Sequence, residues 1–583
     1  MGLAARRVAS QSAGVERNQD SGARPVLAGE HYAHYGAWHI DLPPLSLPDM
    51  LRQAAAQRGN HPLVDFLGRT YSYNEIWRAA EGFAAGLQKR GLGRGDRIGL
   101  YLPNVPLYVA AYFGALLAGA TVVNFSPLYS AEELEAQVAN SGTRVLVTVD
   151  SSALLPTALE VLDHSPLENL VVARLPDMLP RLKGWAMRLF ARKQLTAIPA
   201  RADVTAWQDY LSSQAPTAVP IDPQHDIALL QYTGGTTGTP KGAMLTHQNL
   251  TANARQIRAI DPDQGRRDMV LGVLPLFHVF ANTCILNRTI ANGGCIAMLP
   301  RFEAGQVLAT IGRVRPTSLF AVPTMYQALL DHPQLKDTDF SSLRETISGG
   351  APLPLPLKRR FEEETGVKVV EGYGLTESSG VVSTNPLHGE NREGTIGQVL
   401  PLTRVRLLDK EDPLRDPPGN EPGELAINGP QVMQGYWNRP DAAATAFVER
   451  DGERWFRTGD IATFDTDGFI RIVDRLKDMI NVGGFKVFPS TLEKHLVEHP
   501  SVKEALVIGV PDDYLGERPR AYVTLTDDGP PVTGDDLLAW LKPHIGKHER
   551  IESVVIRDSL PKTPIGKLDR KALVAEVLGA SSQ

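Results

Sequence analysis

The chain has 583 residues, more than one hydrophobic core usually supports, so two or more domains are expected. Its formal charge of −6 excludes the strongly basic balance that is typical of nucleic-acid-binding proteins. Two cysteines, Cys284 and Cys295, are too few for a disulfide framework or a cysteine zinc site, which favours a reducing, cytoplasmic setting.

The N-terminal part contains no apolar stretch of signal-peptide length, and residues 1–40 are predicted to be a disordered leader. Further along, "SYNE" at Ser72–Glu75 has the pattern of a capping box, in which two side chains satisfy backbone N–H groups at a helix start. Apolar residues at helical spacing follow, and Gly91 comes after them. The pattern predicts a helix that ends just before Gly91.

No charged residue occurs between Ile98 and Ala131. Within this stretch, Val105–Val123 is just long enough for a membrane-spanning helix, which needs about 20 apolar residues. Prolines interrupt the stretch, however, at positions 103, 106 and 127. We therefore favour a buried helix, "LYVAAYFGALLAG", followed by a buried strand, "ATVVNF".

The segment "RLKGWAMRLFARKQL" has an apolar stripe at helical spacing, with cations at many of the other positions. The stripe consists of Leu182, Trp185, Ala186, Leu189 and Phe190, and the cations are Arg181, Lys183, Arg188, Arg192 and Lys193. This composition is typical of a helix that lies on an anionic membrane surface. An amphipathic helix packed on its own domain is the alternative, and the sequence leaves both open.

The order of helix and strand signals indicates an α/β fold in three parts. Segments such as "RIGLYL" and "RVLVTV" read as buried strands, and helix and strand signals alternate to about residue 400, which predicts doubly wound parallel sheets. A β-rich subdomain is expected at about 400–475. We expect an N-terminal domain at 41–475, and a small mobile α+β lid domain at 476–583 with "EALVIGV", "AYVTL" and "ESVVI" as strands.

A loop rich in glycine and threonine occurs in "LLQYTGGTTGTPKGAMLTH", Leu229–His247. Glycines allow successive backbone N–H groups to surround an anion, and Lys241 adds a cation, so a polyphosphate is the obvious ligand. The order Pro-Lys-Gly differs from a Walker A loop, and the glycine spacing differs from GxGxxG. Taken alone, the loop could also be a structural turn.

Six further motifs follow this loop in the chain. They are "PLFHVF" (Pro275–Phe280), "SGGAPLP" (Ser348–Pro354), "EGYGLTES" (Glu371–Ser378), "RTGD" ending at Asp460, "DRLKDMINVGGFKVFP" (Asp474–Pro489) and "PKTPIGKLDR" with Lys567. Together with the loop, they resemble the adenylate-forming superfamily of acyl-CoA synthetases, firefly luciferases and peptide-synthetase adenylation domains. The resemblance covers nearly all of the chain after residue 45, and the motifs around Asp460 look most like those of long-chain fatty acyl-CoA synthetases.

The resemblance implies a site for ATP, with phosphates at the glycine–threonine loop, adenine against the backbone of "GGAP" under Tyr373, and ribose at Asp460 and Arg475. The residues it implies for ATP or AMP binding are Thr233, Gly234, Gly235, Thr236, Thr237, Gly238, Lys241, Gly350, Ala351, Glu371, Gly372, Tyr373, Gly374, Thr376, Asp460, Arg475 and Lys567. Taken singly, a turn aspartate or a surface arginine would need no ligand.

The chemistry also follows from the residue types. A carboxylate becomes a good acyl donor when it attacks the α-phosphorus of ATP, and this transfer needs cations and preorganised donors near the phosphoryl oxygens. Glu377 follows Thr376 after the predicted strand "VKVV" (367–370), where open α/β sheets bind ligands, and its carboxylate suits Mg²⁺. The resemblance assigns Glu377 to Mg²⁺, Thr376 to phosphate and Lys567 to the bond between carboxylate and α-phosphate.

The second half-reaction needs a thiol to reach the adenylate. By resemblance, the C-terminal domain rotates about Lys477, withdraws its lysine, and brings Gly483 and Gly484 to the pantetheine arm of coenzyme A. His278 is implied to lie between the carboxylate pocket and the thiol route, and a core histidine bonded to backbone is the alternative. The segment 279–294 is expected to form a wall of the acyl tunnel. Luciferases carry lysine where this chain has Asn481, so light emission is disfavoured.

The sequence thus predicts ATP- and Mg²⁺-dependent ligation of a fatty acid to coenzyme A, most simply a long-chain acid. Alternatives are a fatty-acyl-AMP ligase, a CoA ligase for medium-chain, dicarboxylic or aryl acids, and a non-catalytic acyl-nucleotide binder or membrane transport partner. The intact motifs around Lys567, Glu377 and Asp460 disfavour an inactive homologue. The expected setting is the cytoplasm, with peripheral contact to an anionic membrane and no nucleic acid. The oligomeric state is left open, a homodimer included.

Overall fold

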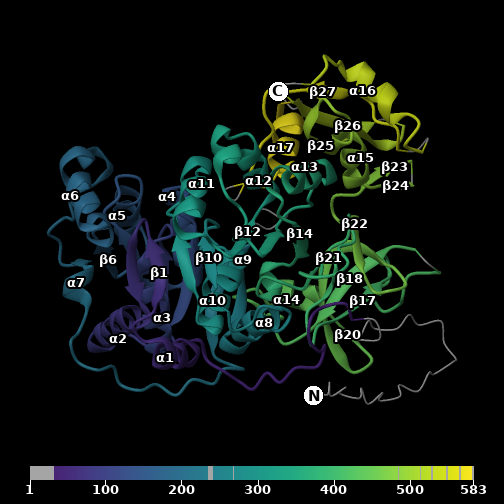
Figure 1. Ribbon diagram of the computed structural model, residues 1–583. Coiled ribbons are helices and arrows are strands. Elements are labelled where there is room, and N and C mark those ends of the chain that lie inside the picture. The colour runs from purple at the N-terminus through teal and green to yellow at the C-terminus, as the bar shows by residue number, and fades with distance from the viewer. Residues whose placement is uncertain are drawn as a thin grey trace, which may run out of the picture.

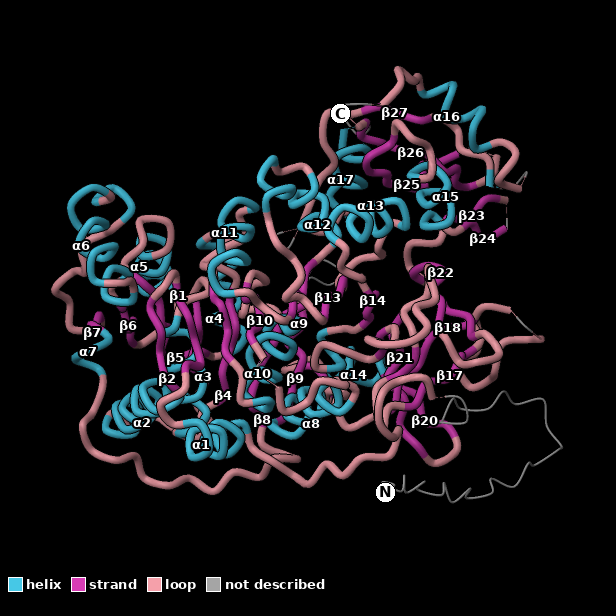
Figure 2. Tube along the Cα trace, in the orientation of Figure 1, coloured by secondary structure: helices cyan, strands magenta, loops and turns pink. Residues whose placement is uncertain are grey.

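The computed structural model describes residues 32–233, 240–266, 268–419, 421–483, 485–512, 514–526, 529–546, 549–563 and 566–580. Two large sheets lie side by side, with helices on their outer sides (Figure 1). A smaller antiparallel sheet flanks them, and a C-terminal unit with its own sheet lies above it in the view of Figure 2. The architecture is the α/β class that the sequence predicts.

The first large sheet has eight strands in the order β19-β9-β8-β4-β3-β5-β6-β7. Their bounds are β3 (Arg97–Tyr101), β4 (Thr121–Phe125), β5 (Thr143–Val149), β6 (Asn169–Ala173), β7 (Val204–Ala206), β8 (Ile227–Thr233), β9 (Lys241–Thr246) and β19 (Gly435–Tyr436). The strands from β8 to β7 are parallel, and β9 and β19 add antiparallel strands at one edge. The predicted strands "RIGLYL" and "RVLVTV" are confirmed as β3 and β5.

The second large sheet has nine strands in the order β16-β15-β14-β13-β12-β10-β11-β1-β2. Their bounds are β1 (Pro62–Phe66), β2 (Arg69–Ser72), β10 (Met269–Gly272), β11 (Cys295–Met298), β12 (Ser318–Ala321), β13 (Glu345–Ser348), β14 (Val370–Tyr373), β15 (Ser383–Thr384) and β16 (Gln398–Val399). The predicted strand at 367–370 is shifted, because pairing with β13 begins only at Val370. The strand therefore contains the polar residues that follow, and its register depends on a partner that the local sequence does not reveal.

Helices connect the parallel strands and lie on both sides of the sheets (Figure 2). Those of the N-terminal part are α1 (Leu47–Arg58), α2 (Tyr73–Lys89), α3 (Pro106–Leu117), α4 (Ala131–Ser141), α5 (Leu155–His164), α6 (Arg181–Phe190), α7 (Trp207–Tyr210), α8 (His247–Ala259), α9 (Val279–Ala281), α10 (Arg288–Asn292), α11 (Ala304–Val314), α12 (Pro323–Leu330), α13 (Leu355–Thr365) and α14 (Pro440–Ala446). Helix α2 begins with the predicted capping box, in which the Glu75 N–H donates to Ser72 Oγ at 3.2 Å. Gly91 follows the helix with a positive φ of 73°, which glycine adopts without strain.

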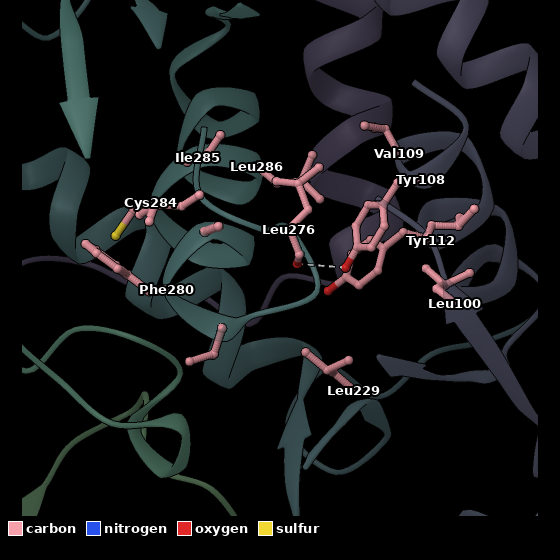
Figure 3. Packing of buried hydrophobic residues seen from close by; sticks show 14 of the residues in the cluster. Leu100, Tyr108, Val109, Tyr112, Leu229, Leu276, Phe280, Cys284, Ile285 and Leu286 are labelled. Atoms are coloured by element: carbon pink, nitrogen blue, oxygen red, sulfur yellow. Dashed lines mark hydrogen bonds between the residues drawn. The ribbon is translucent and has the colours of Figure 1, made fainter. Parts of the chain in front are cut away.

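Helix α3 is apolar on all sides and lies in the core, as the sequence predicts. The Tyr108 hydroxyl lies 2.9 Å from the carbonyl oxygen of Leu276 and donates to it (Figure 3). This contact ties α3 to the segment just before His278. Of the helices in the described ranges, none is both long and apolar enough to cross a membrane.

The β-rich part forms an antiparallel sheet of β17 (Arg404–Leu408), β18 (Gly423–Asn428), β20 (Phe447–Arg450), β21 (Glu453–Phe464) and β22 (Ile470–Arg475). Residues 32–40, which the sequence assigns to a disordered leader, contact the fold at its edge. The Ala33 N–H donates to Gln398 Oε1 at 2.7 Å, and the His34 ring lies 3.1 Å from the Gln398 carbonyl oxygen. Single hydrogen bonds between segments far apart in the chain leave no periodic pattern in the sequence, so the sequence does not predict them. Residues 1–31 lie outside the described residues.

The C-terminal unit has an independent hydrophobic core. Its elements are β23 (Ile480–Val482), β24 (Phe485–Val487), α15 (Pro489–Val497), β25 (Val502–Asp512), β26 (Gly516–Leu525), α16 (Gly534–Leu541), β27 (Val554–Ile556) and α17 (Arg570–Ala580). The three predicted strands are confirmed as β25, β26 and β27. The domain boundary near residue 475 stays a prediction.

Candidate active site

A cavity of about 2330 Å³ lies between the large sheets, the β-rich sheet and the C-terminal unit. The parallel strands β4, β8, β12, β13 and β14 end at this cavity, as strands of open α/β sheets do at their ligand sites. The sequence-predicted residues that line it are Thr233, Lys241, His278, Gly350, Ala351, Glu371, Gly372, Tyr373, Gly374, Thr376, Glu377, Asp460, Arg475, Lys477 and Lys567. Segments more than 300 residues apart in the chain thus meet at one place.

The glycine–threonine loop joins β8 to β9. Gly234, Gly235, Thr236, Thr237 and Gly238 lie outside the described residues. At the two ends of the loop, Thr233 and Lys241 are cross-strand partners, and the Thr233 hydroxyl donates to the Lys241 carbonyl oxygen at 3.4 Å. The Lys241 ammonium lies 5.1 Å from the ring centre of Tyr436. The loop therefore starts and ends at the cavity, with a cation at its exit.

Glu377 lies in a short 3-10 turn, η5 (Thr376–Ser378), just after β14. Its Oε1 accepts a hydrogen bond from the Tyr436 hydroxyl at 2.7 Å. Burial and the adjacent carboxylate raise the pKa of Tyr436, so the phenol stays a neutral donor. Tyr436 thus orients the carboxylate that the sequence assigns to Mg²⁺.

The donor set around Glu377 suits Mg²⁺ better than a transition metal. Within the described ranges, no group of three or more His, Cys, Asp or Glu side chains could hold a metal ion. Mg²⁺ takes one or two protein carboxylates and draws its remaining ligands from phosphate and water. One carboxylate beside a hydroxyl, that of Thr376, fits an ion of this kind.

Asp460 lies within strand β21 and is buried, whereas the sequence indicates a turn. Its partner across the sheet is Arg475 of β22, and the Arg475 Nε lies 3.0 Å from Asp460 Oδ1. The Tyr373 hydroxyl donates to the other carboxylate oxygen at 2.5 Å. The turn assignment is wrong because the hydrophobic run continues on both sides of "RTGD", and antiparallel pairing carries the polar residues within the strand. Asp460 is therefore fixed on both oxygens.

Gly350 and Ala351 follow β13 as expected, and Gly350 has a φ of 81°, which favours glycine. A Cβ on Gly350 would lie 3.0 Å from Lys567 Cε, so the absence of a side chain leaves room for the lysine. On β14, Glu371 Oε1 accepts from the Leu353 N–H at 3.1 Å, which holds the segment after Ala351. Burial raises the pKa of Glu371 to about 7. Glu371 thus shapes the backbone that is predicted to face adenine.

Lys567 reaches the cavity from the C-terminal unit, and the Thr563 N–H donates to the Lys567 carbonyl oxygen at 2.7 Å. Burial lowers the pKa of Lys567 to about 8, and the positive charge of Arg475 adds to this effect. The lysine thus lies near the predicted nucleotide site, in the space that Gly350 leaves free. Its ammonium therefore stays mostly charged at neutral pH and loses its proton as pH rises through 8.

His278 immediately precedes α9 and lines the cavity. Its Nδ1 accepts from the Phe280 N–H at 3.3 Å, which is the backbone bond expected of the structural alternative. Burial lowers the pKa of His278 to about 3, and the nearby charge of Lys567 lowers it further. The imidazole is therefore neutral, and its backbone bond leaves Nε2 as the nitrogen that can carry the proton.

The segment 279–294 contributes only one face to the cavity. Val279, Phe280 and Cys284 line it, and the intervening residues are buried in the core. Figure 3 shows Phe280 and Cys284 on the side away from Leu286, which points toward Tyr108 and Tyr112. The predicted wall is thus formed by residues on one side of a π-helical segment, η3 (Asn282–Asn287), and its neighbour α9.

The residues predicted for the hinge and for coenzyme A lie outside this cluster or at its rim. Lys477 is in an exposed turn between β22 and β23. Gly483 has a φ of 58° at the end of β23, and Gly484 lies outside the described residues. Beside Gly483, the side chains of Phe485 and Tyr514 are 61% and 89% exposed. The structure thus brings Lys567 to the nucleotide residues but keeps the Gly483 turn at the surface.

Tyr436 is the site residue that reasoning from the sequence missed. It lies in "QGYWNRP", more than 50 residues from Glu377, on an edge strand that pairs with β9. The only local feature that could have pointed to Tyr436 as a site residue was an aromatic side chain after glycine in a short polar segment. Its role follows from the pairing of β19 with β9, which places the phenol between Lys241 and Glu377.

Comparisons with known proteins show which family the chain is similar to. A family profile described as AMP-binding enzyme matches residues 51–437, and one described as AMP-binding enzyme C-terminal domain matches residues 491–567. A long-chain-fatty-acid--CoA ligase of Bacillus subtilis (strain 168) is 38% identical over 543 residues, covering 92% of this chain and 95% of the relative. A feruloyl-CoA synthase of Amycolatopsis sp is 37% identical, covering 86% of this chain and 93% of the relative.

Among solved structures, the anthranilate CoA ligase AuaEII in complex with anthranoyl-AMP is similar, with a TM-score of 0.81 and 25% identity. The match covers 93% of this chain and 99% of that structure. With the family profiles matched along both parts of the chain, and with Lys567 facing the end of the sheets, the chain belongs to the AMP-binding enzyme family, the adenylate-forming enzymes that include acyl-CoA synthetases.

Proposed function

We propose that this chain ligates a fatty acid to coenzyme A with ATP, through an acyl-AMP intermediate, and releases AMP and pyrophosphate. The single observation that carries the proposal is the position of Lys567, a buried cation within reach of Gly350 and of the Asp460–Arg475 pair. A carboxylate and a triphosphate that meet there would both face its ammonium. The similarity to long-chain-fatty-acid--CoA ligases supports a long-chain acid as the substrate.

In the first half-reaction, a carboxylate oxygen of the acid attacks the α-phosphorus of ATP, and the bond to the β-phosphate oxygen breaks. Lys567 neutralises charge that develops on the phosphoryl oxygens, and the loop from Thr233 to Lys241 holds the departing phosphates. Glu377, oriented by Tyr436, would hold Mg²⁺ together with the phosphates, and this ion would neutralise their charge. Asp460 binds the ribose hydroxyls, because its two oxygens are fixed acceptors.

In the second half-reaction, the thiol sulfur of coenzyme A attacks the acyl carbonyl carbon, the bond to AMP breaks, and the thiol proton leaves to solvent or a base. The neutral His278 lines the same cavity as Phe280 and Lys567, and it guides the thiol. The C-terminal unit rotates about Lys477, so that Lys567 withdraws and Gly483 and Gly484 line the pantetheine path. The exposed position of the Gly483 turn supports two alternating arrangements.

Aryl acids are a second candidate substrate class. The feruloyl-CoA synthase relative is nearly as similar as the fatty-acid ligase, and Phe280 with Val279 would also contact a planar ring. The long-chain assignment remains preferred, because several fatty-acid ligases from different bacteria match more of the chain. We place the reaction in the cytoplasm, with Mg²⁺-ATP and coenzyme A as co-substrates and with peripheral contact to membranes.

Pyrophosphate release tests the proposal directly. The purified chain is mixed with ATP, Mg²⁺ and a panel of C6 to C18 fatty acids or ferulate, with and without coenzyme A. Acid-dependent release, with thioester formed only when coenzyme A is present, is the expected result. A maximum at long chains supports the preferred substrate, and a maximum with ferulate supports the second. Release without any thioester would instead identify a fatty-acyl-AMP ligase.

A further inference from the structure

We propose that helix α6 docks the protein on an anionic lipid bilayer through an apolar face that points away from the fold. Its four large apolar side chains, Leu182, Trp185, Leu189 and Phe190, are 84%, 60%, 40% and 84% exposed. Exposed hydrophobic residues scattered singly are normal, but four on one short helix form a patch of the kind that marks an interaction site. Figure 1 shows α6 at the far left of the molecule, remote from the C-terminal unit.

The orientation of α6 is fixed by its one buried residue, Gly184. A Cβ at this position would overlap the carbonyl oxygen of Pro176, so the glycine allows the helix backbone to lie against η1 (Leu175–Met178). At 100° per residue, Gly184 and the middle of the apolar stripe lie on opposite faces of the helix. The packed-helix alternative expects the stripe to face the fold, and it therefore fails.

The cations of α6 and of the turn that follows it differ in their contacts with the fold. Lys183 donates to the Leu67 carbonyl oxygen at 2.8 Å, and Arg188 forms an ion pair with Asp177, so both hold the helix to the fold. Arg181 and Lys193 have no ion-pair partner within the part of the chain that the structure describes, and both are exposed. Arg181 begins α6, and Lys193 lies in the 3-10 turn η2 (Arg192–Gln194) just after it, so both are near the apolar face and can meet anionic head groups.

Charge and apolar area together favour a bilayer as the occupant. Cations beside an inserted apolar face are the arrangement that interfacial helices use on anionic lipid. A patch of four side chains on ten residues is small for a stable protein–protein interface, which typically buries about 800 Å² per partner. An acyl-chain substrate that partitions into the same bilayer gives the docking a purpose, and that purpose rests on the proposed function.

Docking at α6 would bring to the membrane the edge of the first large sheet at which its parallel strands end. Helix α6 follows strand β6 in the chain, and the glycine–threonine loop follows strand β8. Strands β6 and β8 belong to the parallel part of the first large sheet. The carboxyl ends of parallel strands lie at the same edge, so α6 follows β6 at the edge where β8 ends at Thr233, a residue that lines the cavity. The remote C-terminal unit would stay free to rotate.

Co-sedimentation of the full chain with vesicles tests the proposal. Wild type should pellet with vesicles that contain phosphatidylglycerol, less with pure phosphatidylcholine, and less again at high salt. Leu182→Glu/Phe190→Glu should lose binding, and Arg181→Glu/Lys193→Glu should lower the partition coefficient by roughly fivefold or more per cation. Leu414→Glu, at a 62% exposed leucine outside α6, is the matched control and should pellet like wild type.

The outcomes separate docking from the ligase activity. Ligation of a short, water-soluble acid should be unchanged in the α6 variants, which also shows that they are folded. Equal pelleting of the wild type and the apolar double variant, or no preference for anionic lipid, overturns the proposal. Self-association of the wild type without lipid, lost in Leu182→Glu/Phe190→Glu, would also overturn it and make this face an interface between copies. Binding to vesicles is measured without any substrate, so it tests the docking proposal even if the chain ligates none of the acids.

Discussion

Two loops of the C-terminal unit carry site residues, and they lie in opposite environments. Lys567 enters the cavity through the space that Gly350 leaves free, where burial lowers the pKa of the lysine to about 8. The turn with Gly483 lies at the surface beside the exposed side chains of Phe485 and Tyr514. One rigid unit cannot present both turns to the cavity at once. Under the proposed mechanism, this arrangement is the one that forms the adenylate.

The opposite wall of the cavity is held together by hydrogen bonds. Asp460 is held by Tyr373 and Arg475, and Glu377 is held by Tyr436, all through hydrogen bonds between elements of the N-terminal part. We propose that both half-reactions use the hydrogen-bonded wall of the N-terminal part. The C-terminal unit would present the turn with Lys567 in the first half-reaction and the turn with Gly483 in the second. Substitutions in either wall, or in the connection between the two parts, should therefore affect the two half-reactions differently.

Removing the buried cation should have the largest effect. Lys567→Ala should slow adenylate formation by about 10²- to 10³-fold, because a preorganised charge at the transition state is lost. Thioester formation from supplied acyl-AMP should be largely spared, since the lysine has withdrawn in that step. Separate assays of the two half-reactions check this. Equal losses in both would contradict the exchange of the two turns.

Blocking the exchange should affect only the second half-reaction. Lys477→Pro fixes φ near −65° in the turn that connects the two parts, and a conformation incompatible with proline costs about 3 kcal/mol. Thioester formation should fall by about 10²-fold while adenylation persists. Lys477→Ala is the control, because it leaves the backbone able to rotate. An unchanged overall rate in the proline variant would remove Lys477 from the hinge.

Neutralising the fixed carboxylate should change the metal dependence. Glu377→Gln keeps the size of the side chain but removes the charge that would hold Mg²⁺. We expect the Mg²⁺ concentration for half-maximal adenylation to rise by about 10- to 100-fold, the range measured for disturbed metal sites. Titration of the rate with Mg²⁺, at saturating ATP, measures it. An unshifted curve would mean that Glu377 is no ligand.

The buried environment of Lys567 should be visible in the pH profile. The lysine must be protonated to act, and burial lowers its pKa to about 8, so kcat/KM for ATP should fall as pH rises through 8. One pH unit higher, the loss should be about tenfold. Lys567→Arg should abolish this falling limb, because a guanidinium stays charged. If kcat/KM of Lys567→Arg still falls as pH rises through 8, the fall is caused by the titration of a group other than Lys567.

The smallest expected effect concerns Tyr436. Tyr436→Phe removes the phenol that donates to Glu377 Oε1 at 2.7 Å but keeps the ring beside Lys241. Adenylation at limiting Mg²⁺ should slow by roughly three- to tenfold, the net value of one hydrogen bond. High Mg²⁺ should restore the rate, which a purely structural role would not allow. Tyr514→Phe, at the exposed turn, should change nothing in this assay.

Much of the fold was readable from the sequence because its signals are local. The capping box at Ser72–Glu75, the strand "RIGLYL" and the apolar helix α3 depend on residues near one another in the chain, and all three are confirmed. The motif order likewise carried the family assignment, which the profiles confirm. Periodicity and capping are properties of one element, so a sequence can show them.

Relations between distant elements were decided only by the tertiary structure. Asp460 was expected in a turn but lies in a strand, because its place depends on pairing with Arg475 in β22. Tyr436 reaches Glu377 only because β19 pairs with β9. The sequence by itself determined the amphipathic character of 181–190. Which way its apolar face points was decided by one close contact, Gly184 against Pro176, and no helical periodicity encodes which face packs.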